Sequence, residues 1–274
     1  MKVTSGWLWT AATVVFLASA APAATQVGPQ ATWTTLADQE CRGNGRNDDR
    51  LCEVREATLA AGGRLTVDGG ANGGVRVTGW ERNEVRVRAR VWAGARSEEW
   101  AAELLRGVEL ETSGGTLRAR GPDRERRESW GVSWDVMVPL ESDLSLETNN
   151  GGISVEGVSG LIDFDAANGG VSLVDVGGDV RGRTRNGGLE VMLAGSTWAG
   201  RGLDAETTNG GVEIAIPEGY SAELETGTVN GRVDLDFPVM VQGRIGRSLF
   251  TVLGDGGPVI RATTTNGSVR LVRR

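Results

Sequence analysis

The stretch LSLETNNGGISVEGVSGLIDFDAANGGVSL, residues 144–173, decides the fold of this chain. It contains two copies of an Asn-Gly-Gly element, and on both sides of each copy apolar residues alternate with polar ones. Alternation with a period of two is typical of strands that bury one face. The stretch therefore predicts short β-strands joined at Asn-Gly turns.

The same element recurs along the second half of the chain and once before it. Its Asn residues are Asn72, Asn150, Asn168, Asn186, Asn209, Asn230 and Asn266. A branched aliphatic residue stands six positions before each of the last six Asn residues, namely Leu144, Ile162, Val180, Leu203, Leu224 and Ile260. Five positions after them stand Val155, Leu173, Val191, Ile214, Leu235 and Leu271. Self-similarity of this kind is the signature of a repeat architecture.

Two all-β architectures fit these repeats. In a single-stranded β-helix, or β-solenoid, each unit is one coil, and equivalent strands stack about 4.8 Å apart. In an antiparallel meander, each Asn-Gly closes a hairpin. Equivalence of distant strands, position by position, favours the solenoid, because a meander does not require it. The solenoid predicts that the strands around Val155, Leu173, Val191 and Ile214 are parallel neighbours.

The Asn-Gly pairs are interpreted as structural turns and not as a ligand site. Asn and Gly tolerate a positive φ, which explains their place at a bend. On this interpretation, Val at Gly187 would destabilise the protein, whereas Asp at Asn186 would matter less.

The chain begins with features of an exported protein. Lys2 is followed by an apolar run from Trp7 to Leu17 and by small residues that suit signal-peptide cleavage. The expected organisation is a signal peptide at 1–23, a Cys-containing segment at 24–60 and a β-solenoid domain at 61–274. The protein would then be periplasmic or extracellular, with no membrane span after cleavage.

The two cysteines, Cys41 and Cys52, lie close together in a polar segment. An oxidising compartment favours a disulfide between them. Two thiols in a chain without His do not complete a zinc site.

One short helix interrupts the strand pattern of the N-terminal half. Ser97 can cap the segment SEEWAAELLRGV, whose apolar positions Trp100, Leu104 and Val108 share one face. We expect this helix to be an insertion that caps or flanks the sheet.

The composition removes most enzymatic chemistry. The chain has no His, and its only Lys lies in the signal sequence, so catalytic triads and Schiff-base lysines are excluded. Paired carboxylates remain, at Asp163 with Asp165 and at Asp234 with Asp236, and by the repeat register they face outward. The Asp175–Gly182 segment resembles a calcium turn but does not repeat. No catalytic, cofactor or metal residue is therefore assigned.

Three stretches resemble a known family: CEVREATLAAGGRLTVDGGANGGVRVTGW, WGVSWDVMVPLESDLSLETNNGGISVEGVSG and GGPVIRATTTNGSVRLV. With the intervening repeats they are similar to a bacterial adhesin-like β-solenoid family of unknown function, related to the head GIN domain. The resemblance covers roughly residues 52–272. It implies a β-helix and an envelope or extracellular role, and it supplies no catalytic or ligand residues.

These observations predict a non-enzymatic structural or interaction protein whose partner is an envelope protein or glycan. The net charge of −7 makes nucleic acid an unsuitable partner. The alternative is a β-helix enzyme that acts on polysaccharide with acidic residues. Carboxylates clustered in a cleft would favour the enzyme, and scattered ones the interaction protein.

Overall fold

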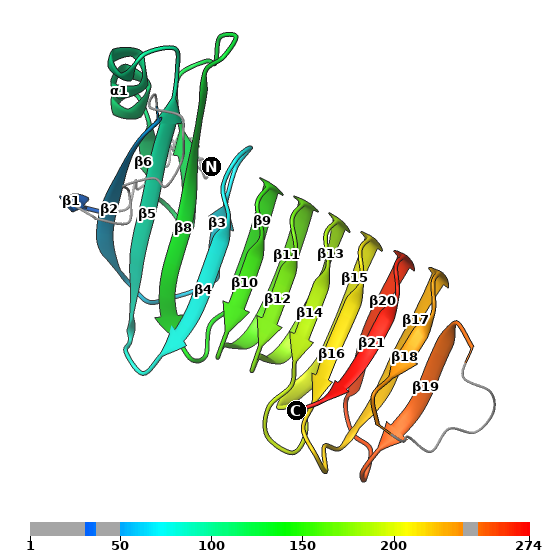
Figure 1. Ribbon diagram of the computed structural model, residues 1–274. Coiled ribbons are helices and arrows are strands. Elements are labelled where there is room, and N and C mark those ends of the chain that lie inside the picture. The colour runs from blue at the N-terminus through cyan, green and yellow to red at the C-terminus, as the bar shows by residue number, and fades with distance from the viewer. Residues whose placement is uncertain (1–30, 37–49, 238–245) are drawn as a thin grey trace, which may run out of the picture.

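The computed structural model describes residues 31–36, 50–237 and 246–274, and this part of the chain is mostly β-strand with one helix, α1 (Glu98–Arg106) (Figure 1). The strands in chain order are β1 (Thr34–Leu36), β2 (Arg50–Ala60), β3 (Leu65–Asp68), β4 (Val75–Trp80), β5 (Glu84–Gly94), β6 (Glu109–Glu111), β7 (Thr116–Arg120), β8 (Ser129–Pro139), β9 (Leu144–Asn150), β10 (Ile153–Glu156), β11 (Ser159–Asn168), β12 (Val171–Val174), β13 (Gly177–Asn186), β14 (Leu189–Met192), β15 (Gly200–Asn209), β16 (Val212–Ile216), β17 (Ala222–Asn230), β18 (Val233–Leu235), β19 (Ser248–Leu253), β20 (Val259–Asn266) and β21 (Val269–Arg273).

These strands form two large mixed sheets. The 11-stranded sheet has the order β1-β2-β5-β8-β4-β10-β12-β14-β16-β21-β18. The 10-stranded sheet has the order β19-β17-β20-β15-β13-β11-β9-β3-β7-β6. The chain crosses from the 10-stranded to the 11-stranded sheet at each Asn-Gly of the repeats, as from β9 to β10 and from β11 to β12. The predicted all-β class is confirmed.

Equivalent strands of successive repeats are parallel neighbours in register. Val155 is paired with Leu173, Leu173 with Val191, and Val191 with Ile214. The strands on the two sides of each Asn-Gly lie in different sheets, so the antiparallel meander is wrong for these units. The parallel stack that the repeat predicted is therefore present from β10 to β16.

The last repeat does not occupy the last place in the stack. β20 lies between β15 and β17, and β21 lies between β16 and β18. The chain runs past one position, forms β17, β18 and the antiparallel edge strand β19, and then returns to fill the gap (Figure 1). This detour explains the long spacing between Asn230 and Asn266. With the antiparallel strands at the N-terminal end, it shows that the sheets are not a uniform stack of coils.

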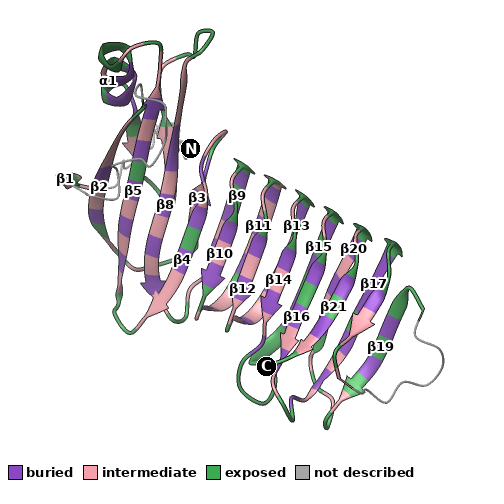
Figure 2. Ribbon diagram, in the orientation of Figure 1, coloured by how far each residue is buried: buried purple, intermediate pink, exposed green. Residues whose placement is uncertain are grey.

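The core lies between the two sheets and consists of the inward members of each alternating pattern. Figure 2 shows buried and less buried residues taking turns along the strands. Phe164 lies in register with Gly182 on the neighbouring strand, and a Cβ on Gly182 would lie 2.4 Å from the Phe164 ring. The glycine therefore makes room for the largest side chain in that row of the core.

The N-terminal part is broader because β2, β5 and β8 pair antiparallel beside β4.

Helix α1 begins after Ser97, whose hydroxyl accepts a hydrogen bond from the Trp100 N–H, as the sequence predicted. Its buried residues are Ala101, Leu104 and Leu105, whereas Trp100 is 57% exposed. Trp100 therefore does not lie on the buried side of the helix with Leu104, because the helix turns the Ala101–Leu105 side toward the sheet.

Candidate interaction surface

The Asn side chains at the turns form a hydrogen-bonded ladder along one edge of the stack. The Nδ2 of each Asn donates to the Oδ1 of the Asn on the adjacent repeat, from Asn168 to Asn150, Asn186 to Asn168 and Asn209 to Asn186. The ladder continues through Asn266 to Asn209 and Asn230 to Asn266, in the spatial order of the strands. At the other end, the Asn150 Nδ2 donates to the carbonyl oxygen of Ala71, which precedes Asn72.

A second ladder runs beside the first. Hydroxyls from the Thr two residues before the Asn donate to the carbonyl oxygen of the first turn glycine on the adjacent repeat. The pairs are Thr148 with Gly73, Thr184 with Gly169, Thr207 with Gly187, Thr264 with Gly210 and Thr228 with Gly267. The five Thr residues are buried, so their hydroxyls satisfy acceptors that water reaches poorly.

The first glycine of each turn is required by close packing, and only at Gly267, with a φ of +159°, is φ also positive. Among the described residues other than glycine, only Arg127 and Asp175 have a positive φ. The Asn residues of the turns therefore do not adopt a positive φ. Gly187 also lacks a positive φ, but a Cβ there would lie 2.2 Å from the carbonyl oxygen of Gly169. The explanation by positive φ is therefore wrong for the turn Asn residues and for the first glycine of every turn except the one at Gly267.

The second glycine of each turn is under weaker constraint. A Cβ on Gly188 would have the Gly211 carbonyl oxygen as its nearest neighbour, at 3.6 Å. The last two repeats carry Ser268 and Arg232 at this position. The glycines leave a shallow, open hollow of about 560 Å³ on the outer face of the 11-stranded sheet.

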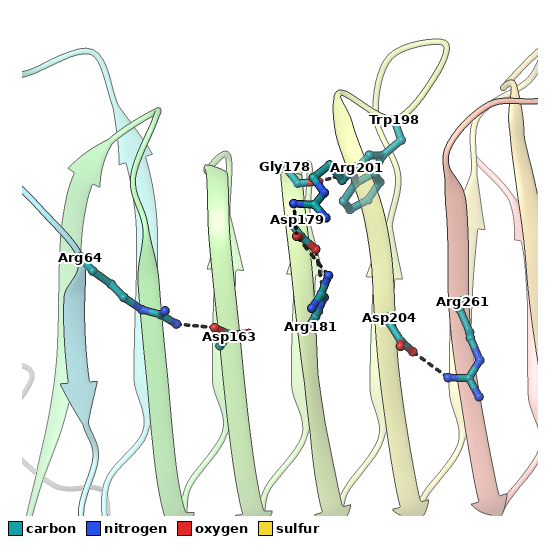
Figure 3. A network of polar contacts seen from close by, with 9 residues as sticks. All are labelled: Arg64, Asp163, Gly178, Asp179, Arg181, Trp198, Arg201, Asp204 and Arg261. Atoms are coloured by element: carbon teal, nitrogen blue, oxygen red, sulfur yellow. Dashed lines mark hydrogen bonds and ion pairs between the residues drawn. The ribbon is translucent and has the colours of Figure 1, made fainter.

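The outer face of the 10-stranded sheet carries a row of alternating charges, part of which Figure 3 shows. Asp163, Arg181, Asp204, Arg261 and Glu225 occupy register positions on successive strands of the sheet. Arg261 contacts Asp204 at 2.9 Å and Glu225 at 3.3 Å. The hydrogen bond and charge of Asp204 are the main reasons that the pKa of Arg261 is raised.

Flanking ion pairs extend this row. Asp163 pairs with Arg64 from the loop before β3, and Asp165 with Arg183 at 2.9 Å. Asp179 contacts both Arg181, at 3.1 Å, and Arg201, at 3.4 Å. In Figure 3, the Trp198 side chain lies beside Gly178 and Arg201, and its Nε1 donates to the Gly178 carbonyl oxygen at 3.0 Å. We call the outer face from Asp163 to Glu225 the zwitterionic face.

The carboxylates considered for catalysis are each paired with arginine. Besides the pairs of Asp163 and Asp165, Asp234 contacts Arg232 at 2.7 Å and Asp236 contacts Arg270 at 2.8 Å. The first two lie on the 10-stranded sheet and Asp234 on the 11-stranded sheet, so the structure does not bring the two pairs together.

The two aspartates of the segment that resembles a calcium turn, Asp175 and Asp179, are also paired with arginine. Asp175 accepts a hydrogen bond from Arg274 at 2.9 Å, and Asp179 has the two arginine partners named above. Within the described ranges, no group of three or more His, Cys, Asp or Glu residues could hold a metal ion.

The tryptophans divide between core and surface. Trp134 and Trp198 are buried, and the Trp134 Nε1 donates to the Asp68 carbonyl oxygen at 2.9 Å. Trp92 is partly exposed, and the Arg50 guanidinium lies 4.4 Å from its ring centroid.

The features tied to export fall mainly outside the described residues. Both the predicted signal peptide at 1–23 and Cys41 lie there, whereas Cys52 lies in β2. The disulfide and the signal peptide remain predictions. The one helix in the described part of the chain is too short to cross a membrane.

No protein-family model and no curated protein matches the chain. Among similar solved structures is a protein from Clostridium sporogenes named "putative cell adhesion protein". It is 10% identical to this chain, and the match covers 81% of this chain and 100% of that protein with a TM-score of 0.44. A "putative adhesin" from Bacteroides fragilis has 10% identity, coverages of 81% and 97% and a TM-score of 0.29. A "putative lipid binding protein" from Parabacteroides distasonis has 12% identity, coverages of 84% and 98% and a TM-score of 0.33. Two of these names agree with the adhesin-like resemblance, and none refers to a head GIN domain.

Proposed function

We propose that this chain is a non-enzymatic, exported interaction protein of the cell envelope or extracellular space. The zwitterionic face is its binding surface, and the partner is an envelope protein or glycan. The observation that carries the proposal is the pairing of every candidate catalytic carboxylate with an arginine on an exposed sheet face. A hydrolase would need two carboxyl groups in different protonation states across a cleft.

The domain organisation belongs to the same proposal. Residues 1–23 are a cleaved signal peptide, 24–60 a Cys-containing segment and 61–274 an adhesin-like domain. The parallel repeats of this domain are coils of a β-solenoid, into which the last repeat inserts out of order. Stacked coils of this kind hold their outward residues in fixed rows, which suits recognition of an extended partner.

The alternating charges restrict the kind of partner. Asp163, Arg181, Asp204 and Arg261 follow one another on adjacent strands, about 4.8 Å apart. A partner with alternating charges, or a neutral polymer rich in hydrogen-bonding groups, matches this row. A uniformly anionic polymer would meet a like charge at every second strand.

The test combines binding and cleavage with insoluble peptidoglycan sacculi and with solubilised envelope proteins. The variant Arg183→Glu/Arg261→Glu reverses two positive positions of the zwitterionic face. Arg270→Glu is the matched control, because Arg270 lies on the other sheet and also forms an exposed ion pair. Surface pairs contribute only about 0–1 kcal/mol, so both proteins should fold.

We expect one of the two partners to be retained, the double variant to bind it about tenfold more weakly, and the control to bind normally. Binding should also weaken as salt is raised. If the wild type released reducing ends from sacculi and Asp163→Asn or Asp165→Asn abolished that release, the protein would be a polysaccharide-active enzyme instead. Equal binding by the double variant and the wild type would show that the zwitterionic face is not the binding surface.

A further inference from the structure

A cleft of about 740 Å³ opens between the two sheets at the N-terminal end of the molecule. One wall comes from the end of β2, the start of β5 and the end of β8 in the 11-stranded sheet. The other comes from the start of β3 and the loop that leads into β7, and the segment before β9 and the first residues of β11 complete the lining. It lies apart from the zwitterionic face, which is on the outside of the 10-stranded sheet.

The cleft is an opening into the hydrophobic core. Leu65, Val85 and Val138 line it and belong to the core cluster, and the partly buried Leu59 packs against that cluster. Elsewhere in this broad part of the molecule, helix α1 covers the core with Leu104 and Leu105.

Turns with left-handed glycines form the rim. Gly63 has a φ of +67°, Gly114 of +62° and Gly115 of +72°. A Cβ on Gly63 or Gly114 would meet nothing within 4 Å, so the chain there is surrounded by open space. The backbone conformation, and not packing, selects glycine at Gly63 and Gly114, whereas a Cβ on Gly115 would also lie 2.8 Å from the Arg64 carbonyl oxygen.

The polar groups of the cleft have one sign of charge. The exposed Glu141 and Asp143 line it, and Asn83, Thr112 and Ser142 add neutral polar groups. The Asp143 Oδ1 accepts a hydrogen bond from the Leu161 N–H at 2.8 Å, which fixes the orientation of that carboxylate. Among the described residues that line the cleft, none is basic.

We propose that this cleft binds a small amphipathic molecule that inserts an apolar chain between the sheets and places a cationic or neutral head beside Glu141 and Asp143. The volume lies in the range of small-molecule sites, and apolar walls with a few convergent polar groups are typical of them. An anionic head is disfavoured, because it would meet two carboxylates and no counter-charge. The proposal stands independently of the zwitterionic face.

The test uses decylamine, decan-1-ol and decanoate, which share a chain length and differ in their heads. Each is titrated against the folded mature protein by isothermal calorimetry below its aggregation concentration. We expect one saturable site per chain, with decylamine bound at least about tenfold more tightly than decanoate, a difference of about 1.4 kcal/mol. Glu141→Lys should remove or reverse this preference.

A pair of variants on one strand localises the site. Leu59→Trp fills the cleft from β2 and should weaken decylamine binding by at least about tenfold. Thr58→Trp adds the same side chain to the outer face of β2 and should leave binding unchanged. Melting curves show whether each variant is folded; if Leu59→Trp is not, Val85→Met fills the same wall with a smaller change. Absence of saturable binding, binding unaffected by the filling variant, or tighter binding of decanoate would each overturn the proposal.

Discussion

The Nδ2 of Asn186 lies 2.8 Å from the Oδ1 of Asn168 and donates a hydrogen bond to it, although the two residues are a full repeat apart in the chain. Asn186 in turn accepts a hydrogen bond from Asn209 at 2.8 Å. Its side chain therefore acts as donor and acceptor at once, a combination that a carboxylate cannot provide.

Asn186→Asp should consequently destabilise the protein at neutral pH, by about 1–2 kcal/mol. The carboxylate would face the Asn168 oxygen, which favours protonation and raises the pKa of the new carboxyl group in the folded state. A raised folded pKa means that stability is greatest at low pH and is lost as pH rises through that pKa. Thermal melts of variant and wild type between pH 4 and 8 measure this.

The control for this effect is Asn186→Ala, which removes both hydrogen bonds without adding a titratable group. Its difference in melting temperature from the wild type should not depend on pH. If the loss of melting temperature in Asn186→Asp were also independent of pH, the Asn ladder would not be the cause of the destabilisation.

Adjacent glycines should respond very differently to the same substitution. Gly187→Ala places a Cβ 2.2 Å from the Gly169 carbonyl oxygen, so neighbouring repeats must separate, and the expected cost is about 1–3 kcal/mol or more. Gly188→Ala meets its nearest atom at 3.6 Å and should cost less than about 1 kcal/mol. Urea denaturation of the two variants compares them directly, and similar losses would show that close packing is not what selects the first glycine.

The inserted last repeat should be among the most protected parts of the molecule. Strands β20 and β21 each have a parallel neighbour on both sides, whereas β19 is an edge strand with Phe250 62% exposed. Amide hydrogen exchange depends on the free energy of local opening. Peptides covering β20 and β21 should exchange as slowly as those of β15 and β16, and more slowly than β19. Rapid exchange at this C-terminal repeat would contradict the strand order.

Cys41 and Cys52 are expected to form a disulfide in the exported protein. Closing a loop of this length should contribute about 2–3 kcal/mol in the chain-entropy model. Thiol labelling of the purified mature protein under denaturing, non-reducing conditions should detect no free thiol. Two labelled thiols per chain would refute the pairing.

The repeat made the strands and their parallel stacking predictable. Residues such as Val155, Leu173 and Val191 stand at equivalent positions of successive repeats, and this equivalence favours equivalent strands as neighbours, as the structure has them. The reason for the turn glycine was not predictable in the same way. Glycine at a bend indicates positive φ from the sequence alone, and only the approach of Gly187 to Gly169 reveals the actual constraint.

The sequence by itself determined the period-two burial pattern, the position of each turn and the capped helix, because these depend on neighbouring residues. Only the tertiary structure decided that β20 and β21 insert between earlier strands. The strand edges of all repeats are alike, so the local sequence does not determine which edge a given strand pairs with. It also decided that Asp163 meets Arg64 and Asp204 meets Arg261, because those partners are far apart in the chain. Charge pairing across strands depends on which strands become neighbours, and only the folded sheets set that order.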